Sequence, residues 1–434
     1  MISRVMIGVM RGARGGSRRR EPALPKVQKI EVSEKNIKLR AVLVAVFVVI
    51  GVIALTVFVA TLLRKEDGWR EIETTSAVAG LSDEFVLQYD LGSTASATAE
   101  YRSISQLYTK TGSHLYALFD RYEEKEGVVN LYTISHSPNE TLQIDPVLYD
   151  AFAAMEASGM RYLYLAPVYA EYESLFHCEN DIYAANRDPK RSESAREYIA
   201  ALMRYCVDET MINLELLGDD RVCLRVSEEY LTFAEEYELD ALIDFSWLKN
   251  AFIIDALADA LASAGYTVGN LSSYDGYMRN LDTTGNEYTY NYFDRYQNGI
   301  YHAATLQYRG DLAVVDLRTY ALRQQDTMRM YAYADGVYAT LYVDPADGYY
   351  RNALHGLLAY SDTNGCAEIA LSVAPAFIAE QLDQTLLSQV TEQDIYALWT
   401  VDGLISNNGP DLTVNESSLH SSETITYRTI TVGD

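Results

Sequence analysis

The sequence predicts an α+β ectodomain that follows a single transmembrane helix. Helix patterns and antiparallel hairpin patterns occupy separate stretches of the chain, which favours α+β over a regular parallel α/β sheet. An uncharged run of 23 residues, 41–63, precedes these patterns. At about 1.5 Å of rise per residue the run reaches about 34 Å, enough for a hydrocarbon core of about 30 Å.

The basic start of the chain sets the expected orientation. The first 40 residues carry 11 Lys or Arg against three Asp or Glu, and the positive-inside rule leaves such a tail in the cytoplasm. We therefore expect a basic cytoplasmic tail (1–40), a transmembrane helix (41–63), a juxtamembrane linker (64–80), an extracytoplasmic domain (81–406) and a polar C-terminal segment (407–434). A cleaved signal peptide is the alternative, although its apolar core is usually shorter.

Charge and composition exclude some functions and leave others open. The whole chain has a formal charge of −26, so the part after the basic tail carries −34. A surface this acidic repels nucleic acid, and we expect no nucleic-acid partner. The 35 tyrosines fit half-buried strands, with an adhesive or binding face as the sharper alternative. Four cysteines are either free thiols or members of one or two disulfides: Cys178, Cys206, Cys223 and Cys366.

The expected elements of the domain follow from hydrophobic periodicity. A strand at 84–89 precedes four helices, at 103–122, 146–158, 193–207 and 248–264. A hairpin follows, with strands at 328–334 and 337–343 around the Asp335-Gly336 turn. The alternation at 424–432 predicts either an edge strand or a surface tail.

Residues 243–265 have the pattern of a strand, a turn and a helix. An apolar run ends at Phe245, a turn follows at Ser246 and Trp247, and Gly265 closes a helix with apolar residues four apart. The free N–H groups and positive dipole of a helix start suit phosphate or carboxylate binding. Close approach of a ligand to the backbone favours glycine, and this turn has none.

The order of these elements resembles the FAD:protein FMN transferase family, known as ApbE. The family motif LDLGGIAKGYAxD is similar to IDFSWLKNAFIID at 243–255, in which two aspartates agree. The motif LFSRY resembles LFDRY at 118–122, HIIDPxTG resembles LYVDPADG at 341–348, and ADALST resembles EIALSV at 368–373. The matches occur in the family's order along roughly 85–405 of the chain.

The resemblance implies a fold and an activity. Family members have an α+β fold related to T-folds, hold FAD between subdomains and lie outside the cytoplasm. They split FAD and, using magnesium, attach FMN through a phosphoester to a threonine of a partner flavoprotein. Carried over to this chain, the resemblance assigns cofactor contacts to Tyr122, Asp244, Asn250 and Asp344.

Several positions depart from the family motifs. The glycine pair of the turn becomes Ser246 and Trp247, which adds side chains where backbone would approach the nucleotide. The family's lysine becomes Asn250, the histidine before the DP loop becomes Leu341, and the aspartate of the FDP motif becomes Ala166. Polar contacts are lost at each of these positions.

The metal motif departs furthest. The family's metal-binding aspartate and threonine correspond to Ile369 and Val373, and neither side chain has an oxygen. Magnesium requires oxygen ligands, and phosphoryl transfer depends on it. We therefore expect no productive magnesium site, so Mg²⁺ is a doubtful cofactor while FAD is kept as a possible one.

Three hypotheses of function remain. The first is a membrane-anchored, catalytically degenerate ApbE-like protein that binds a flavin-like ligand or a partner such as an extracytoplasmic flavoprotein or envelope protein. The second is an active Mg-dependent FMN transferase whose metal site uses other oxygens. The third is a tyrosine-rich envelope structural or adhesion protein that reuses the fold. The sequence leaves the partner, the oligomeric state and nucleotide binding open.

Overall fold

The computed structural model describes residues 66–431, apart from short gaps, and nine residues between 42 and 56. The gaps are 77–79, 93–94, 297–298, 323–325, 327, 402, 415–416, 421–422 and 427. The predicted tail at 1–40 and most of the predicted span at 41–63 lie outside the described residues. Within the part that is described, no helix has the length and apolar character to cross a membrane. Residues 65–434 form a compact unit separate from 1–64.

A nine-stranded sheet organises this unit. Its strand order is β1-β2-β6-β7-β10-β13-β14-β15-β19, and all neighbours are antiparallel except β15 and β19. The strands are β1 (Gly68–Glu71), β2 (Phe85–Leu91), β6 (Val268–Ser273), β7 (Tyr277–Asp282), β10 (Leu312–Arg318), β13 (Gly356–Ser361), β14 (Tyr396–Val401), β15 (Leu404–Asn407) and β19 (Arg428–Thr431). The C-terminal alternation therefore forms an edge strand, one of the two predicted outcomes.

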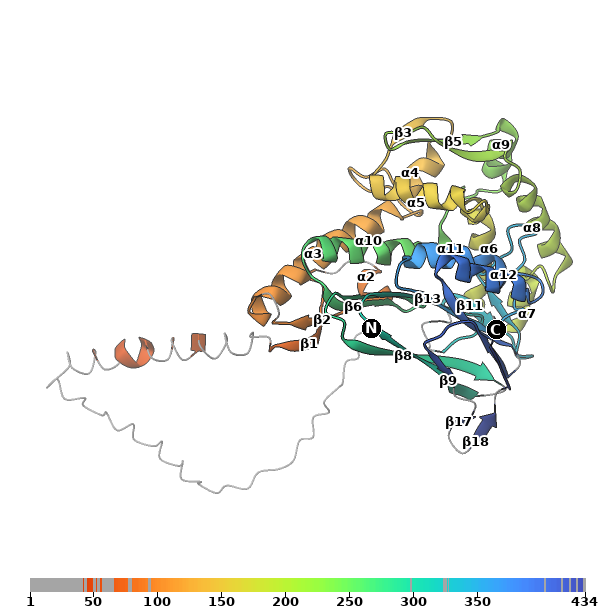
Figure 1. The fold of residues 1–434 in the computed structure, drawn as a ribbon. Helices are drawn as coiled ribbons and strands as arrows, with labels where there is room; N and C mark the ends of the chain where they lie inside the picture. Colours follow the sequence, from red (N-terminus) through yellow and green to blue (C-terminus); the bar gives the residue numbers. More distant parts are fainter. Residues whose placement is uncertain are drawn as a thin grey trace, which may run out of the picture. The chain divides into compact units, whose positions relative to one another are not determined.

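Helices pack on one face of the sheet (Figure 1). They are α2 (Leu81–Glu84), α3 (Ala97–Leu118), α10 (Lys249–Ser263), α11 (Cys366–Phe377) and α12 (Gln384–Gln389), the last followed by the 3₁₀ turn η4 (Val390–Gln393). Strand β2 illustrates why this face is apolar: alternate residues of a strand point to the same face of the sheet. Phe85, Leu87, Tyr89 and Leu91 are all buried there.

A mainly helical segment lies between α3 and α10 in the chain. It contains α4 (Leu131–His136), α5 (Pro146–Ala157), η1 (Tyr162–Leu165), α6 (Ala166–Phe176), α7 (Asp181–Arg187), α8 (Glu193–Cys206) and α9 (Glu228–Glu236). A small sheet joins it, in the order β3 (Thr141–Gln143), β5 (Arg221–Val226), β4 (Ile212–Leu216). Side-chain caps start these helices: Asp145 accepts a bond from the N–H of Val147 before α5, and Ser192 one from Ala195 before α8.

The opposite face of the large sheet is covered by a second layer of strands (Figure 1). Here β8 (Glu287–Tyr296) and β9 (Gly299–Arg309) form a long hairpin, and β16 (Leu412–Val414) pairs with β9. Tyr292 and Leu306 are buried against Val314 and Leu358 of the large sheet. A separate pair, β17 (Ser417–His420) and β18 (Glu423–Thr426), follows in the chain.

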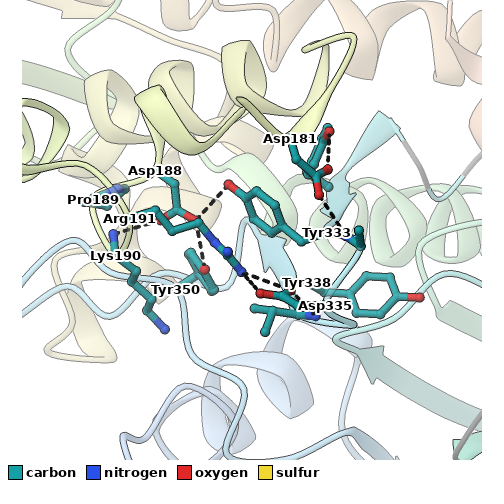
Figure 2. Close-up of polar contacts among 12 residues, drawn as sticks. Asp181, Asp188, Pro189, Lys190, Arg191, Tyr333, Asp335, Tyr338 and Tyr350 are labelled. Atoms are coloured by element: carbon teal, nitrogen blue, oxygen red, sulfur yellow. Dashed lines mark hydrogen bonds and ion pairs between the residues drawn. The ribbon is translucent and has the colours of Figure 1, made fainter. Parts of the chain in front are cut away.

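A buried polar network attaches the helical segment to a short hairpin, β11 (Met330–Ala332) and β12 (Tyr338–Thr340). Figure 2 shows Asp188, which is fully buried, with its carboxylate between two tyrosines. It accepts bonds from the hydroxyls of Tyr333 (2.9 Å) and Tyr350 (3.1 Å), and Arg191 lies 3.6 Å away. Arg191 also contacts Asp335 in the hairpin turn, at 2.8 Å.

The predicted fold class is confirmed in its coarse form, a mixed fold with antiparallel sheets and packed helices. The four predicted helices correspond to α3, α5, α8 and α10, and the predicted hairpin forms around Gly336, which has a φ of +87°. The transmembrane helix stays a prediction. The two edge strands of the sheet come from segments predicted to lie outside the domain: β1 from the predicted linker and β19 from the predicted C-terminal segment. The four cysteines are free thiols.

Candidate functional site

Of the predicted strand, turn and helix at 243–265, the structure contains the turn and the helix α10 but not the strand. Residues 243–245 are not in a strand. The N–H of Asp244 instead donates to the carbonyl of Leu163 in η1, at 2.9 Å. The prediction of a strand there was wrong: a short apolar run does not distinguish a strand from buried irregular backbone. The turn itself is η2 (Ser246–Leu248), and Gly265 follows α10 with a φ of +86°.

Ser246 occupies a backbone conformation that glycine adopts without strain. Its φ is +49°, and its buried Oγ has no hydrogen-bond partner. The next residue, Trp247, is only 8% exposed and packs edge-to-face on Tyr342, with ring centroids 5.3 Å apart. Tyr342 in turn packs on Phe377 of α11 at 4.8 Å. A row of aromatic rings therefore fills the space beside the turn.

A cleft of about 660 Å³ opens beside this turn. It lies where the start of α10, the ends of α2 and α3, the β6–β7 turn and α6 come together. Three residues with predicted cofactor contacts line it: Tyr122, Asp244 and Asn250. The structure thus brings these three together at a cleft large enough for a small ligand.

One wall of the cleft is built on a buried arginine. Arg121 is held by Asp244, at 3.5 Å, and by Glu173 of α6. Its guanidinium lies 4.6 Å from the ring centroid of Tyr122, which is 68% exposed and whose hydroxyl donates to Glu173 at 3.2 Å. Burial raises the pKa of Glu173 and Asp244 adds to that rise, although Arg121 opposes it. Asp244 therefore positions the arginine.

The opposite wall is a network of two carboxylates and an amide. The Nδ2 of Asn250 donates to Glu84 at 2.7 Å and to Asp275 at 2.9 Å. Lys249 lies 3.5 Å from Glu84, and Arg329 lies 3.2 Å from Asp275. Burial acts to raise the pKa of Glu84, but the two cations and the amide outweigh it and lower the pKa.

The cleft carries an excess of negative charge. Of the described residues that line it, four are Lys or Arg and seven are carboxylates: Asp83, Glu84, Asp120, Glu173, Asp244, Asp275 and Asp326. Lys249, Arg121 and Arg329 each face carboxylates within 4 Å. A pyrophosphate would meet this excess unless a cation accompanied it.

Two aspartates of the family motifs have other surroundings. Asp344 is absent from the described cleft lining; its carboxylate accepts a bond from the N–H of Ala346 at 2.8 Å and contacts Arg351 at 2.9 Å. Asp255 accepts bonds from the N–H groups of Cys366 (2.9 Å) and Ala367 (2.8 Å) at the start of α11. Both carboxylates hold local structure.

The positions that correspond to metal ligands lie in the core. Ile369 and Val373 are fully buried on α11, among the apolar side chains between helices and sheet. Neither residue offers an oxygen, so these two side chains cannot be ligands of a magnesium ion. Within the described ranges, no three His, Cys, Asp or Glu side chains gather closely enough to hold a metal.

Comparisons with known structures identify the fold. The structure is similar to that of the ApbE protein from Thermotoga maritima, with a TM-score of 0.52 and 14% identity over 77% of this chain and 95% of that chain. It is also similar to the flavin transferase ApbE from Vibrio cholerae, with a TM-score of 0.50 and 11% identity over 81% of this chain and 97% of that chain. The chain has the ApbE fold. No protein-family model and no curated protein sequence matches it.

The ApbE fold explains what the motifs found and what they missed. The motif resemblance located the α10 turn and Tyr122, since both lie in contiguous segments, but it did not single out Arg121 beside Tyr122. It missed Glu84, Asp275 and Arg329, which the fold brings together from separate elements. The Asp275-Gly276 pair between β6 and β7 was the available signal, because Asp-Gly is a typical hairpin turn.

Proposed function

We propose that this chain is a membrane-anchored, extracytoplasmic ApbE-fold protein that binds a flavin-like ligand or a partner protein without transferring FMN. The observation that carries the proposal is the burial of Ile369 and Val373 in the core of α11. In the family these positions supply the magnesium ligands on which transfer depends. Two buried aliphatic side chains cannot take that role.

Two further observations support loss of transfer over an active enzyme with substitute ligands. Trp247 fills the space beside the turn where the family has glycine, and it is locked by Tyr342. The carboxylates beside the turn are already engaged, with Asn250 bridging Glu84 and Asp275. Substitute ligands for magnesium would have to break these contacts. The aromatic walls and exposed Tyr122 still offer a surface for a planar ring.

A titration of the full-length chain with FAD, followed by flavin fluorescence, tests this proposal. Titrations with and without Mg²⁺ should give the same curve, and no FMN should become attached to a threonine-containing acceptor flavoprotein. Asp244→Ala should weaken any metal-independent binding, because Arg121 would lose a partner in the cleft wall. Mg²⁺-dependent saturable binding with transfer of FMN would contradict the proposal and favour the active enzyme.

The membrane anchor is tested separately. The proposal places 41–63 across the bilayer, with the basic tail in the cytoplasm and the ApbE-fold unit outside it. The full chain should remain in membranes after an alkaline carbonate wash, and a chain without 41–63 should not. Protease added to intact spheroplasts should digest the ApbE-fold unit and leave the tail protected. The proposed orientation would be wrong if the protease left the ApbE-fold unit intact in whole spheroplasts but digested it once the spheroplasts were lysed.

A further inference from the structure

A second cavity lies on the other face of the nine-stranded sheet. It has a volume of about 740 Å³ and is lined by β1, β2, β6, β7 and β10 of the large sheet on one side and by β8 and β9 on the other. This is the face away from α10 and α11, and the cavity adjoins the acidic cleft at Tyr274, Tyr277 and Arg318, which line both. The aromatic and uncharged polar character of its lining sets it apart from the acidic cleft.

Aromatic rings form one part of this lining. Trp69 of β1 is 40% exposed and packs edge-to-face on Tyr288 of β8, with centroids 6.1 Å apart. Tyr288 stacks on Tyr308 of β9 at 5.5 Å, and Phe293 is 41% exposed. Tyr and Trp rings give rigid, amphipathic contact area at low entropic cost. Here the rings lie beside a cavity. Packing between the strands does not require Trp69 to be partly exposed, so its ring is available to a ligand.

Uncharged polar side chains form the other part. Gln88 of β2 lies directly opposite Asn270 of β6 in the strand register, and Ser272 follows two residues later on the same face. Among the described residues these three side chains have no hydrogen-bond partner; Gln88 is exposed, and Asn270 and Ser272 are half-buried. Amides and hydroxyls both donate and accept, so this row can bond hydroxyl groups in either direction.

The charged groups at the cavity are matched within the protein. Asp316 of β10 accepts a bond from the hydroxyl of Tyr290 at 2.9 Å and has Arg318 at 3.7 Å. Glu287 is paired with Arg309 across the β8–β9 hairpin. The described lining has two carboxylates and one cation, and each carboxylate is paired with an arginine, so it offers no unpaired cation for a phosphate.

We propose that this second cavity binds a neutral oligosaccharide. The apolar face of a pyranose ring would lie on Trp69 and the neighbouring tyrosine rings, and its hydroxyls would bond Gln88, Asn270 and Ser272. A purely apolar ligand would leave those polar groups without partners, which is unfavourable. A nucleotide would bring phosphate charge to a lining with no free cation among its described residues. The proposal is independent of what the acidic cleft binds.

Tryptophan fluorescence of the full-length chain tests the proposal directly. Of the three tryptophans, Trp247 is 8% exposed and Trp399 is fully buried, so a ligand-induced change reports mainly on Trp69. The probes are cellohexaose, maltohexaose and chitohexaose, with glucose as the short comparison. At least one hexasaccharide should bind saturably and more tightly than glucose.

Variants then locate the binding, measured by equilibrium dialysis because Trp69 is the fluorophore. Trp69→Ala and the double variant Gln88→Ala/Asn270→Ala should each weaken binding by about tenfold or more, while Trp69→Phe should keep it within a few-fold. Tyr183→Ala, which removes an exposed ring on α7, is the control and should leave the affinity unchanged. The proposal fails if no hexasaccharide binds saturably, or if binding survives both Trp69→Ala and the double variant.

Discussion

Ser246 holds a conformation that glycine would hold without strain. The left-handed φ of +49° costs a residue with a Cβ about 1–2 kcal/mol, and the unpaired buried Oγ adds to that cost. Glycine loses about 0.5–1 kcal/mol through its greater freedom in the unfolded chain. We therefore expect Ser246→Gly to raise the free energy of unfolding by about 1 kcal/mol, measured by urea titration.

A serine in an ordinary conformation provides the control. Ser158 has a φ of −66°, and its Oγ donates to the carbonyl of Met155 at 2.6 Å. Ser158→Gly should therefore lower the stability, by about 0.5–1 kcal/mol or more. A fall in stability for Ser246→Gly similar to that of Ser158→Gly would show that the turn is not strained.

Glu84 should make the stability depend on pH in the acid range. Its pKa is lowered in the folded protein: burial alone would raise it, but Lys249, Arg329 and Asn250 outweigh burial. A lowered carboxyl pKa stabilises the fold above the unfolded pKa, which is 4.5, and this stabilisation is lost as pH falls through the lower folded value.

The test compares urea midpoints of the wild type and Glu84→Gln from neutral pH down through the acid range. The variant should be less stable at neutral pH, and the difference should shrink once the pH is below 4.5. Glu197→Gln changes an exposed glutamate on α8 and should leave the pH profile unchanged. A constant difference at every pH would mean that the contribution of Glu84 does not depend on its charge.

The motifs brought three of the four candidate residues together, and their contact with a cofactor stays a prediction. Tyr122, Asp244 and Asn250 line one cleft because the LFDRY segment and the α10 turn meet there. Asp344 belongs to a turn whose own N–H groups and Arg351 occupy its carboxylate. A motif match identifies the residue type at a position. It does not show whether the neighbours leave that side chain free for a ligand.

At the scale of elements, Asp255 links α10 to the start of α11 and to β7. Its carboxylate accepts two backbone N–H groups of α11 and pairs with Arg279 at 2.9 Å. Removing one partner of a buried ion pair typically costs about 3–5 kcal/mol. Asp255→Ala should therefore lower the free energy of unfolding by about 3 kcal/mol. Asp259→Ala, one turn later on the exposed side of α10, should change it by less than about 0.5 kcal/mol.

The Asp188 network should contribute comparably to the attachment of the helical segment (Figure 2). Asp188→Ala would leave the hydroxyls of Tyr333 and Tyr350 and the guanidinium of Arg191 without this acceptor, so we expect a loss of about 3 kcal/mol. Asp335→Ala breaks an exposed ion pair with the same arginine and should cost about 1 kcal/mol or less. If the two variants lost the same free energy of unfolding in urea titrations, the burial of Asp188 would not explain its contribution to stability.

Whole elements were easier to predict than their arrangement. The helices α5, α8 and α10 have strong periodicity, and α5 and α8 also have side-chain caps, so their bounds differ from the predicted ones by a residue or so. The sheet order could not be derived, because β2 pairs with β6 across more than 170 intervening residues. That pairing also places Gln88 beside Asn270, so the second cavity could not be predicted from the sequence. The tyrosine count fitted half-buried strands and left a binding face as an alternative.

At the scale of the whole molecule, net charge should limit stability at low salt. The chain has 61 acidic against 35 basic residues, and mutual repulsion of like charges opposes the compact state. Salt screens this repulsion, since the Debye length falls from about 30 Å at 0.01 M to about 8 Å at 0.15 M ionic strength. We expect the Tm to rise by about 3 °C or more between these two conditions, which corresponds to roughly 1 kcal/mol.

The choice of salt separates screening from a magnesium site. Screening depends mainly on ionic strength, so NaCl and MgCl₂ at equal ionic strength should raise the Tm by similar amounts. A specific site would add a stabilisation that grows with the logarithm of the Mg²⁺ concentration above its Kd. Such an excess with MgCl₂, absent with NaCl and removed by Glu84→Gln, would place a metal in the acidic cleft. That result would overturn the argument from Ile369 and Val373 that the chain has no magnesium site.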